Sequence, residues 1–245
     1  MLTEAERAEL RARFHPDYSR LVFAPVDEAL ERHVKPDALV LDAGAGMGTW
    51  VLRRHRATTR LCVGLDLCRP AGWAGGAFIE GDVTRLPFAP GVLDLVVCYN
   101  VVEHLADPCA AFSEFTRVLS PGGWLIVKTP NLRSPLIAAA RLVSIGVRRR
   151  LKRRLGDAEA AVFPAFYRCN SASELHEALT GAGFSREVLV GVDQTCEYLA
   201  FSRLTFAAGL LYSRLMQARS GGRWRSSLVA VYQKQQATTV SSLQA

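Results

Sequence analysis

The sequence lacks the cysteine spacings that mark metal sites and disulfide frameworks. Its six cysteines form no CxxC pair, have no histidine at zinc-finger spacing and lie mostly in apolar runs. They are Cys62, Cys68, Cys98, Cys109, Cys169 and Cys196. Free thiols in a reducing compartment are therefore a better interpretation than metal ligands or disulfides, and we expect no metal site.

Long apolar runs are absent as well. No run approaches the ~18 residues that a membrane-spanning helix needs. The N-terminal stretch MLTEAERAEL is acidic and helical in pattern, whereas a signal peptide is basic and then apolar. We therefore expect a cytoplasmic chain without a signal peptide, and peripheral contact with a membrane surface is a second interpretation.

Acidic residues are outnumbered by basic ones, 23 to 30, which gives a net charge of +7. Such an excess favours an anionic partner without naming it. The 245 residues are otherwise ordinary for a globular chain, with 49% apolar and 22% charged residues, and they can bury a sizeable core. We see no internal repeat.

A glycine-rich stretch, LVLDAGAGMGTW at 39–50, dominates the sequence. A short apolar run is followed by Gly44, Gly46 and Gly48 and then by a new apolar stretch, which predicts a buried strand, a tight turn and a helix over 49–55. Glycine has no Cβ, so the turn can adopt positive φ and a ligand can lie against the backbone. Asp42 at the strand tip suits a cationic or amino-bearing ligand better than a pyrophosphate.

Two further acidic residues follow predicted strands. Asp66 ends a strand over 60–67, about twenty residues beyond the glycines, where a carboxylate can accept both hydroxyls of a ribose. Asp82 follows a short strand over 77–80. The alternatives are a surface-turn aspartate at Asp66 and an N-cap or turn aspartate at Asp82.

The remaining pattern predicts one α/β domain with a doubly wound sheet. Strands are expected over 92–99, 124–129, 186–191 and 226–233, with helices between them. Helices are also expected over 3–14 and 25–33. The stretch 198–218 reads as a long helix with Leu204, Ala208, Leu211 and Leu215 on one face.

Several motifs, taken together, carry a family resemblance. Val40 to Gly48 resembles the first motif of the class I S-adenosylmethionine-dependent methyltransferases. The phrases YNVVEHLADP and VLSPGGWLIVKTPN are similar to later motifs of the small-molecule members, and the resemblance is specific from about Leu39 to Asn131. It implies a Rossmann-like sheet of seven strands, mostly parallel with the last strand antiparallel.

The resemblance also implies a domain plan. Residues 1–36 would form a helical cover over the ligand pocket, and residues 37–236 would form the methyltransferase domain. That domain would carry a helical insertion at about 132–170 and the helical segment at about 198–218, and residues 237–245 are expected to be disordered.

The cofactor implied is S-adenosylmethionine. Asp66 would bind the ribose, Asp82 the adenine amino group, the next backbone amide the adenine ring, and Asn100 would lie beside the methionine end. The expected binding residues are Asp42, Gly44, Ala45, Gly46, Gly48, Asp66, Leu67, Asp82, Val83 and Asn100.

Methyl transfer needs few chemically active residues, because positioning alone can supply roughly 7 to 11 kcal/mol of the acceleration. If the acceptor is a hydroxyl, His104 is the leading candidate for the base, since imidazole titrates near neutrality. The alternative is that Glu103 and His104 simply start a helix. His15, Tyr18 and Tyr167 are weaker candidates.

A basic run from Arg148 to Arg154 contains five arginines and a lysine. It can be a solvated helix face, a contact with a membrane or lipid phosphate, or a nucleic-acid contact, which we disfavour because no RNA-binding module accompanies it. The oligomeric state is left open.

We predict an enzyme that methylates a small molecule, most plausibly an oxygen of a glycan, quinone-like or natural-product acceptor. The alternatives are a methyltransferase acting on RNA or protein, or on a lipid-linked acceptor at the membrane surface. A binding module without activity is disfavoured, because Asp42, Asp66 and the glycines are all intact.

Overall fold

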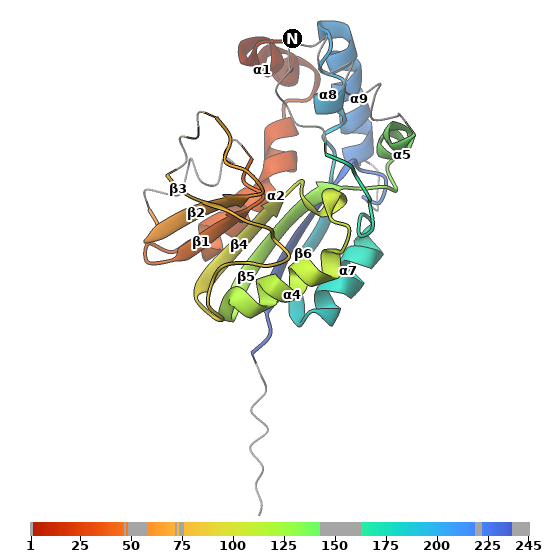
Figure 1. Cartoon of the computed structure of the whole chain (residues 1–245). Coiled ribbons are helices and arrows are strands. Elements are labelled where there is room, and N and C mark those ends of the chain that lie inside the picture. Colours follow the sequence, from red (N-terminus) through yellow and green to blue (C-terminus); the bar gives the residue numbers. More distant parts are fainter. Residues whose placement is uncertain are drawn as a thin grey trace, which may run out of the picture.

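A computed structural model describes residues 2–46, 48, 58–71, 73, 76–142, 163–218 and 222–236 (Figure 1). Seven strands form one sheet in the order β3-β2-β1-β4-β5-β7-β6. They are β1 Leu39–Ala43, β2 Leu61–Asp66, β3 Ala77–Glu80, β4 Leu93–Tyr99, β5 Leu119–Pro130, β6 Phe184–Val192 and β7 Ser227–Lys234. β7 pairs antiparallel with both neighbours and the other pairings are parallel, so the predicted sheet is confirmed.

Helices cover both faces of the sheet (Figure 1). They are α1 Glu4–Phe14, α2 Tyr18–His33, α4 Pro108–Val118, α5 Pro135–Arg141, α7 Ala172–Gly181, α8 Thr195–Tyr198 and α9 Arg203–Ala218, with a 3-10 turn, η1, at Val102–His104. Phe112 of α4 and Leu175 of α7 pack on one face, and Leu30 of α2 packs on the other. The central strands are therefore apolar along their length, because both of their faces are buried.

α2 begins earlier than the sequence predicts. The predicted helix starts at Pro25, whereas α2 starts at Tyr18 and carries Pro25 inside it. A proline inside a helix cannot donate its backbone hydrogen bond, which normally disfavours this position. Tyr18 and Val22, in the turns before the proline, are both buried, so tertiary packing offsets the lost bond.

The helix predicted over 198–218 starts later in the structure, since α8 ends at Tyr198 and α9 begins at Arg203, and its packing face is a different one. Phe206 and Leu210 of α9 are fully buried against the N-terminal helices. Leu204 and Leu215, on the predicted apolar face, are 80% and 61% exposed. The apolar periodicity of the sequence indicated an amphipathic helix, but it did not indicate which face of the helix packs against the rest of the protein.

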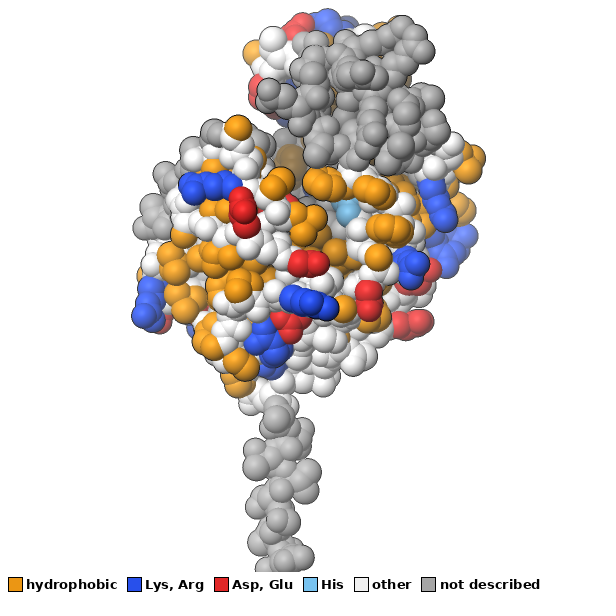
Figure 2. Space-filling model, in the orientation of Figure 1, with side chains coloured by type: hydrophobic (Ala, Val, Ile, Leu, Met, Phe, Trp, Pro, Cys, Tyr) orange, Lys and Arg blue, Asp and Glu red, His pale blue; other side chains and the backbone are white. Residues whose placement is uncertain are grey.

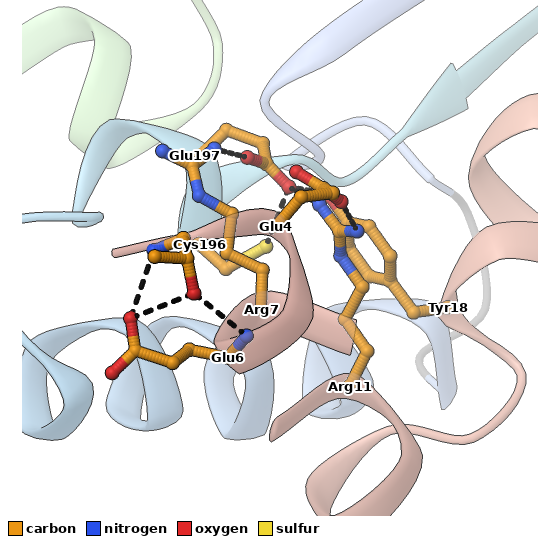
Figure 3. Close-up of polar contacts among 8 residues, drawn as sticks. Glu4, Glu6, Arg7, Arg11, Tyr18, Cys196 and Glu197 are labelled. Carbon is orange, nitrogen blue, oxygen red and sulfur yellow. Dashed lines mark hydrogen bonds and ion pairs between the residues drawn. The ribbon is translucent and has the colours of Figure 1, made fainter. Parts of the chain in front are cut away.

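α1, α8 and α9 gather above the sheet edge in Figure 1, and a carboxylate joins α8 to α1 and α2. Glu197 of α8 accepts hydrogen bonds from Arg7 at 3.1 Å, Arg11 at 2.9 Å and the Tyr18 hydroxyl at 3.1 Å (Figure 3). α1 itself starts with an N-cap, since Thr3 accepts from the Glu6 amide at 3.2 Å. The N-terminal helices are thus fastened to a segment almost 200 residues away.

Several predictions fall outside the described residues. They concern the helix over 49–55, the tail at 237–245 and most of the insertion at 132–170, including Arg148 to Arg154. Of that insertion the structure describes α5 and the residues from 163 onward. Among the described residues, no helix combines the length and the apolar character needed to cross a bilayer.

Candidate active site

A cavity of about 620 Å³ opens at the carboxyl ends of β1, β2 and β4. Its wall contains seven of the predicted binding residues and the predicted base. They are Gly44, Gly46, Asp66, Leu67, Asp82, Val83, Asn100 and His104. In Figure 2, hydrophobic side chains surround a hollow on this face and a histidine side chain is visible within it. This is the edge at which open α/β sheets bind ligands.

A second cavity, of about 360 Å³, shares the glycine turn with the first. Gly44, Gly46 and Asn100 line both cavities, while Ala45 and Gly48 line only the smaller one. Its other walls come from α2 and from the ends of β4 and β5. The glycine turn therefore lies between two spaces, one under α2 and one facing His104.

The turn needs glycine for two different reasons. Gly44 has φ +76°, and a Cβ there would lie 2.1 Å from Cγ2 of Val101. Gly46 has φ +51°, but a Cβ there would meet no atom of the described residues within 4 Å. Gly44 therefore allows close backbone packing, whereas Gly46 leaves the space above the backbone open for a ligand.

Asp66 is held against the glycine turn by backbone amides. One carboxylate oxygen accepts from the Gly46 amide at 2.8 Å and the other from the Leu67 amide at 2.7 Å. Each oxygen has a second lone pair, so the side chain is oriented and can still accept hydrogen bonds from a ligand. The structure thus places Asp66 where the sequence predicted it.

Asp82 follows β3 and lies at the wall of the larger cavity. Its Oδ1 accepts from the Thr84 amide at 2.8 Å, as an aspartate in a turn does. The two interpretations of Asp82 are therefore compatible, since Oδ1 holds the turn and no described residue donates a hydrogen bond to Oδ2.

Asp42 occupies a different place from the other acids. It lies in β1, is fully buried and does not line either cavity. Burial and, secondarily, the negative charge of Asp42 raise the pKa of the neighbouring Tyr99 phenol. The structure thus sets Asp42 beneath the turn and does not show the direct cavity contact expected of a strand-tip acid.

Asn100 follows β4 with φ 55°, a conformation that asparagine tolerates better than most residues. Its amide donates to the Lys128 carbonyl at 2.7 Å, which ties the loop after β4 to β5. The backbone thus turns sharply where the two cavities meet, consistent with the expected position beside a ligand.

His104 belongs to η1 and lines the larger cavity. Its Nδ1 lies 2.7 Å from the Pro164 carbonyl oxygen. A carbonyl only accepts, so Nδ1 carries the proton and Nε2 of the neutral ring is an acceptor. The Nε2 atom of His104 is therefore available as an acceptor. Glu103 and His104 do not start the next α-helix, because α4 begins only at Pro108.

Glu103 organises this side of the cavity, although its neighbour was the residue singled out from the sequence. The carboxyl is buried, which raises its pKa, and it accepts from Thr129 Oγ1 at 3.1 Å. Its backbone carbonyl accepts from the amides of Phe166, at 2.7 Å, and Tyr167, at 3.1 Å. Glu103 thus fastens the segment 163–167 over the cavity.

The weaker candidates lie away from the cavity wall. His15 and Tyr18 are buried in the contact between the N-terminal helices and α9, and Tyr167 flanks the lining residues without joining them. Sequence reasoning missed Lys128 and Tyr99, which line the smaller cavity. The sequence feature that could have pointed to Lys128 is its position as the single lysine within the apolar strand WLIVKT.

Residues 41–127 match a family model described as a methyltransferase domain. Over these residues the chain resembles the methyltransferase family. The resemblance inferred from the motifs is therefore confirmed, and the matched residues span β1 to β5, the strands that build both cavities.

Similar proteins support the same family. The chain is 35% identical over 94 residues to an uncharacterized methyltransferase of Mycobacterium sp. (strain JLS), covering 36% of this chain and 37% of that one. It is 36% identical over 104 residues to a demethylmenaquinone methyltransferase of Mycolicibacterium vanbaalenii, covering 41% and 44%. The chain thus spans less than half the length of either curated relative.

The fold is shared with solved structures. An S-adenosylmethionine dependent methyltransferase from Mesorhizobium loti superposes with a TM-score of 0.56 at 18% identity, covering 86% of this chain and 97% of that one. At this identity the likeness concerns the fold.

Proposed function

We propose that this protein transfers the methyl group of S-adenosylmethionine to a small-molecule acceptor, most plausibly to an oxygen atom. The observation that carries the proposal is the Asp66 carboxylate, which the amides of Gly46 and Leu67 orient at the cavity wall. A carboxylate in this position after the second strand suits the two hydroxyls of a ribose.

The residues present fit this cofactor. The space above Gly46 is open, Asp66 and Asp82 lie along one cavity, and its volume of about 620 Å³ lies within the range typical of small-molecule sites. Asp66 would hold the ribose, Asp82 and the Val83 amide the adenine, and Asn100 and the glycine turn the methionine end. When bound, S-adenosylmethionine supplies a methyl group that its sulfonium charge activates for in-line displacement.

His104 is proposed to accept the proton of an acceptor hydroxyl. Its Nδ1 is occupied by the Pro164 carbonyl, so Nε2 would take the proton while the acceptor oxygen forms its bond to the methyl carbon and the carbon–sulfur bond breaks. Phe163 and Phe166 line the same cavity and would exclude water from it. The protein supplies mainly position and a dry environment.

A small acceptor is favoured by the size of the cavity and by its apolar walls. The relative named demethylmenaquinone methyltransferase supports a quinone-like acceptor, and a glycan or natural-product acceptor is compatible with the same cavity. Membrane contact through Arg148 to Arg154 stays a prediction.

Titration calorimetry with S-adenosylmethionine tests the donor site. We expect saturable heat with the wild type and at least about tenfold weaker binding by Asp66→Ala, because hydrogen bonds to a charged group contribute roughly 1.5 to 3 kcal/mol. Asp37→Ala, in the exposed turn before β1, is the matched control and should bind normally. Equal affinity of the two variants would exclude the ribose role of Asp66.

The acceptor is sought with labelled donor and a cell extract, followed by mass analysis of the compound that gains a methyl group. With that compound, His104→Gln should lower turnover roughly 10²- to 10⁴-fold without changing donor affinity. Unchanged turnover would rule out the base, and label found in RNA or protein would overturn the small-molecule assignment.

A further inference from the structure

A third cavity, of about 630 Å³, shares no lining residue with the other two. Four segments that are distant in sequence converge on it: the turn after β5, the start of α7, the end of β6 and the loop before β7. The turn after β5 places it at the same sheet edge as the active site, beyond the strand that carries Lys128.

The cavity is cationic. Arg133, Arg223 and Arg225 line it, and none of its lining residues is acidic. Arg225 has a structural role, since its guanidinium donates hydrogen bonds to the backbone carbonyls of Gly191 at 2.9 Å and Gln217 at 3.2 Å. Arg133 and Arg223 are exposed, and within the described part of the chain neither forms an ion pair with an acid.

One buried amide side chain fixes the backbone beneath all three arginines. Asn131 is 1% exposed, and its Oδ1 accepts from the Arg133 amide at 3.0 Å. Its Nδ2 donates to the carbonyls of Arg223 at 2.9 Å and Arg225 at 2.8 Å. The arginines are therefore held together by a structured element, and among the described residues Arg133 and Arg223 have no acidic partner.

The floor of the cavity is equally fixed. A Cβ on Gly191 of β6 would lie 2.4 Å from the Gly222 carbonyl oxygen, so the loop before β7 lies directly on the strand. Ser173, in the first turn of α7, adds an exposed hydroxyl to the wall. The N-terminal end of this ten-residue helix also favours negative charge nearby.

We propose that this cavity binds the phosphate group of a phosphorylated small molecule through Arg133 and Arg223. Guanidinium groups present paired N–H donors that match phosphate oxygens, and Arg225 adds positive charge from beneath. The ligand class is a phosphomonoester or diphosphate, either on a soluble compound or on the head group of a lipid. The site does not depend on the donor site, so each can fail without the other.

Titration calorimetry with inorganic pyrophosphate at low ionic strength tests the site. The wild type should bind with saturation, and the double variant Arg133→Gln/Arg223→Gln should bind at least tenfold more weakly. Arg60→Gln, an exposed arginine just before β2 at the opposite sheet edge, is the matched control and should bind like the wild type. Ser173→Glu lies on an exposed first helical turn, where an acid is tolerated, and should also weaken binding by charge repulsion.

Two further probes identify the source of the phosphate. Binding of monomeric dihexanoyl phosphatidic acid shows that the site takes a phosphate-bearing molecule from solution. Cosedimentation with phosphatidylcholine vesicles containing phosphatidic acid shows that it takes the phosphate from a lipid surface. Binding of either probe that is lost in the double variant supports the site. The proposal is overturned if the wild type binds none of the three probes at millimolar concentration, or if the double variant binds as well as the wild type.

Discussion

In the proposed function the larger cavity has a donor side and a cover, and the two regions are built in different ways. The donor side consists of consecutive motifs on β1 to β4, where backbone amides and carboxylates meet within about twenty residues of each other, as Gly46 and Asp66 do. The cover consists of α1, α8, α9 and the segment 163–167. Glu197 joins α8 to α1, Arg203 joins α9 to α1, and the backbone carbonyl of Glu103 holds the segment 163–167, all across large separations in sequence. Local chain geometry specifies the first region, and tertiary contacts specify the second.

The difference has an energetic consequence. Gly44 is confined by a strained backbone angle and a close neighbour, so a change there disturbs both the strand and the turn. The cover depends on ion pairs whose side chains are partly exposed, at 23% for Arg7 and 29% for Glu197. Such pairs are weaker and are screened by salt. We therefore expect the donor side to tolerate substitution less well than the cover.

Gly44→Ala should give the largest effect. A Cβ would overlap Val101, and φ +76° is unfavourable for alanine, so the free energy of unfolding should fall by about 3 kcal/mol. Urea unfolding measures this change, and calorimetry should show that donor binding is lost.

Gly91→Ala is the control for backbone strain. Gly91 has φ +71°, but in the part of the chain that the structure describes a Cβ there would meet no atom within 4 Å. This variant should lose only about 1 kcal/mol. If the two variants were equally destabilised, close packing at Gly44 would not be the cause.

Lys128 lies where the two regions meet, and its substitution should give the next largest effect. Burial lowers the pKa of Lys128 to about 8, against the opposing charges of Glu197 and Glu103. Because the folded state disfavours the charged form, stability should rise as the pH increases from about 8 toward the ordinary value of 10.5.

Lys128→Met should remove this rise and stabilise the protein at neutral pH by about 2 kcal/mol. Thermal unfolding across this pH interval measures both effects. A wild type whose stability is flat between these pH values would contradict the lowered pKa.

Glu197→Gln tests the cover. Glutamine lacks the negative charge that faces Arg7 and Arg11, so the free energy of unfolding should fall by about 1 to 2 kcal/mol. This decrease should be smaller at high salt, because salt screens the ion pairs. Urea unfolding at two salt concentrations measures the loss. Glu4→Gln, whose side chain is 74% exposed, is the control and should change stability by less than about 0.5 kcal/mol. A larger loss in the control would show that the cluster around Glu197 does not hold the cover.

Arg203→Gln should give the smallest effect. Arg203 of α9 pairs with Glu6 and Glu9 of α1 at the surface, where water screens the attraction. The urea midpoint should not change measurably. A clear shift would mean that surface pairs also contribute to the contact between α1 and α9.

Prediction from the sequence succeeded where the determinant is local. The alternation of apolar strands with acids and glycines at their ends was enough to place Asp66, Asp82 and the glycine turn at one sheet edge. The sequence pattern did not predict the start of α2 correctly. Pro25 suggested a helix start, but the burial of Tyr18 and Val22 extends the helix back to Tyr18. The pattern was likewise insufficient for α9, where both helix faces carry apolar residues.

The order of motifs along the chain determined the fold and the donor-binding edge, because strand ends and glycine turns depend on residues that are neighbours in sequence. The tertiary structure alone decided that Asp42 lies beneath the turn, that Glu103 holds the segment over His104, and that three arginines from distant loops meet at Asn131. Those arrangements depend on which segments pack together, and only the folded chain brings them within hydrogen-bonding distance.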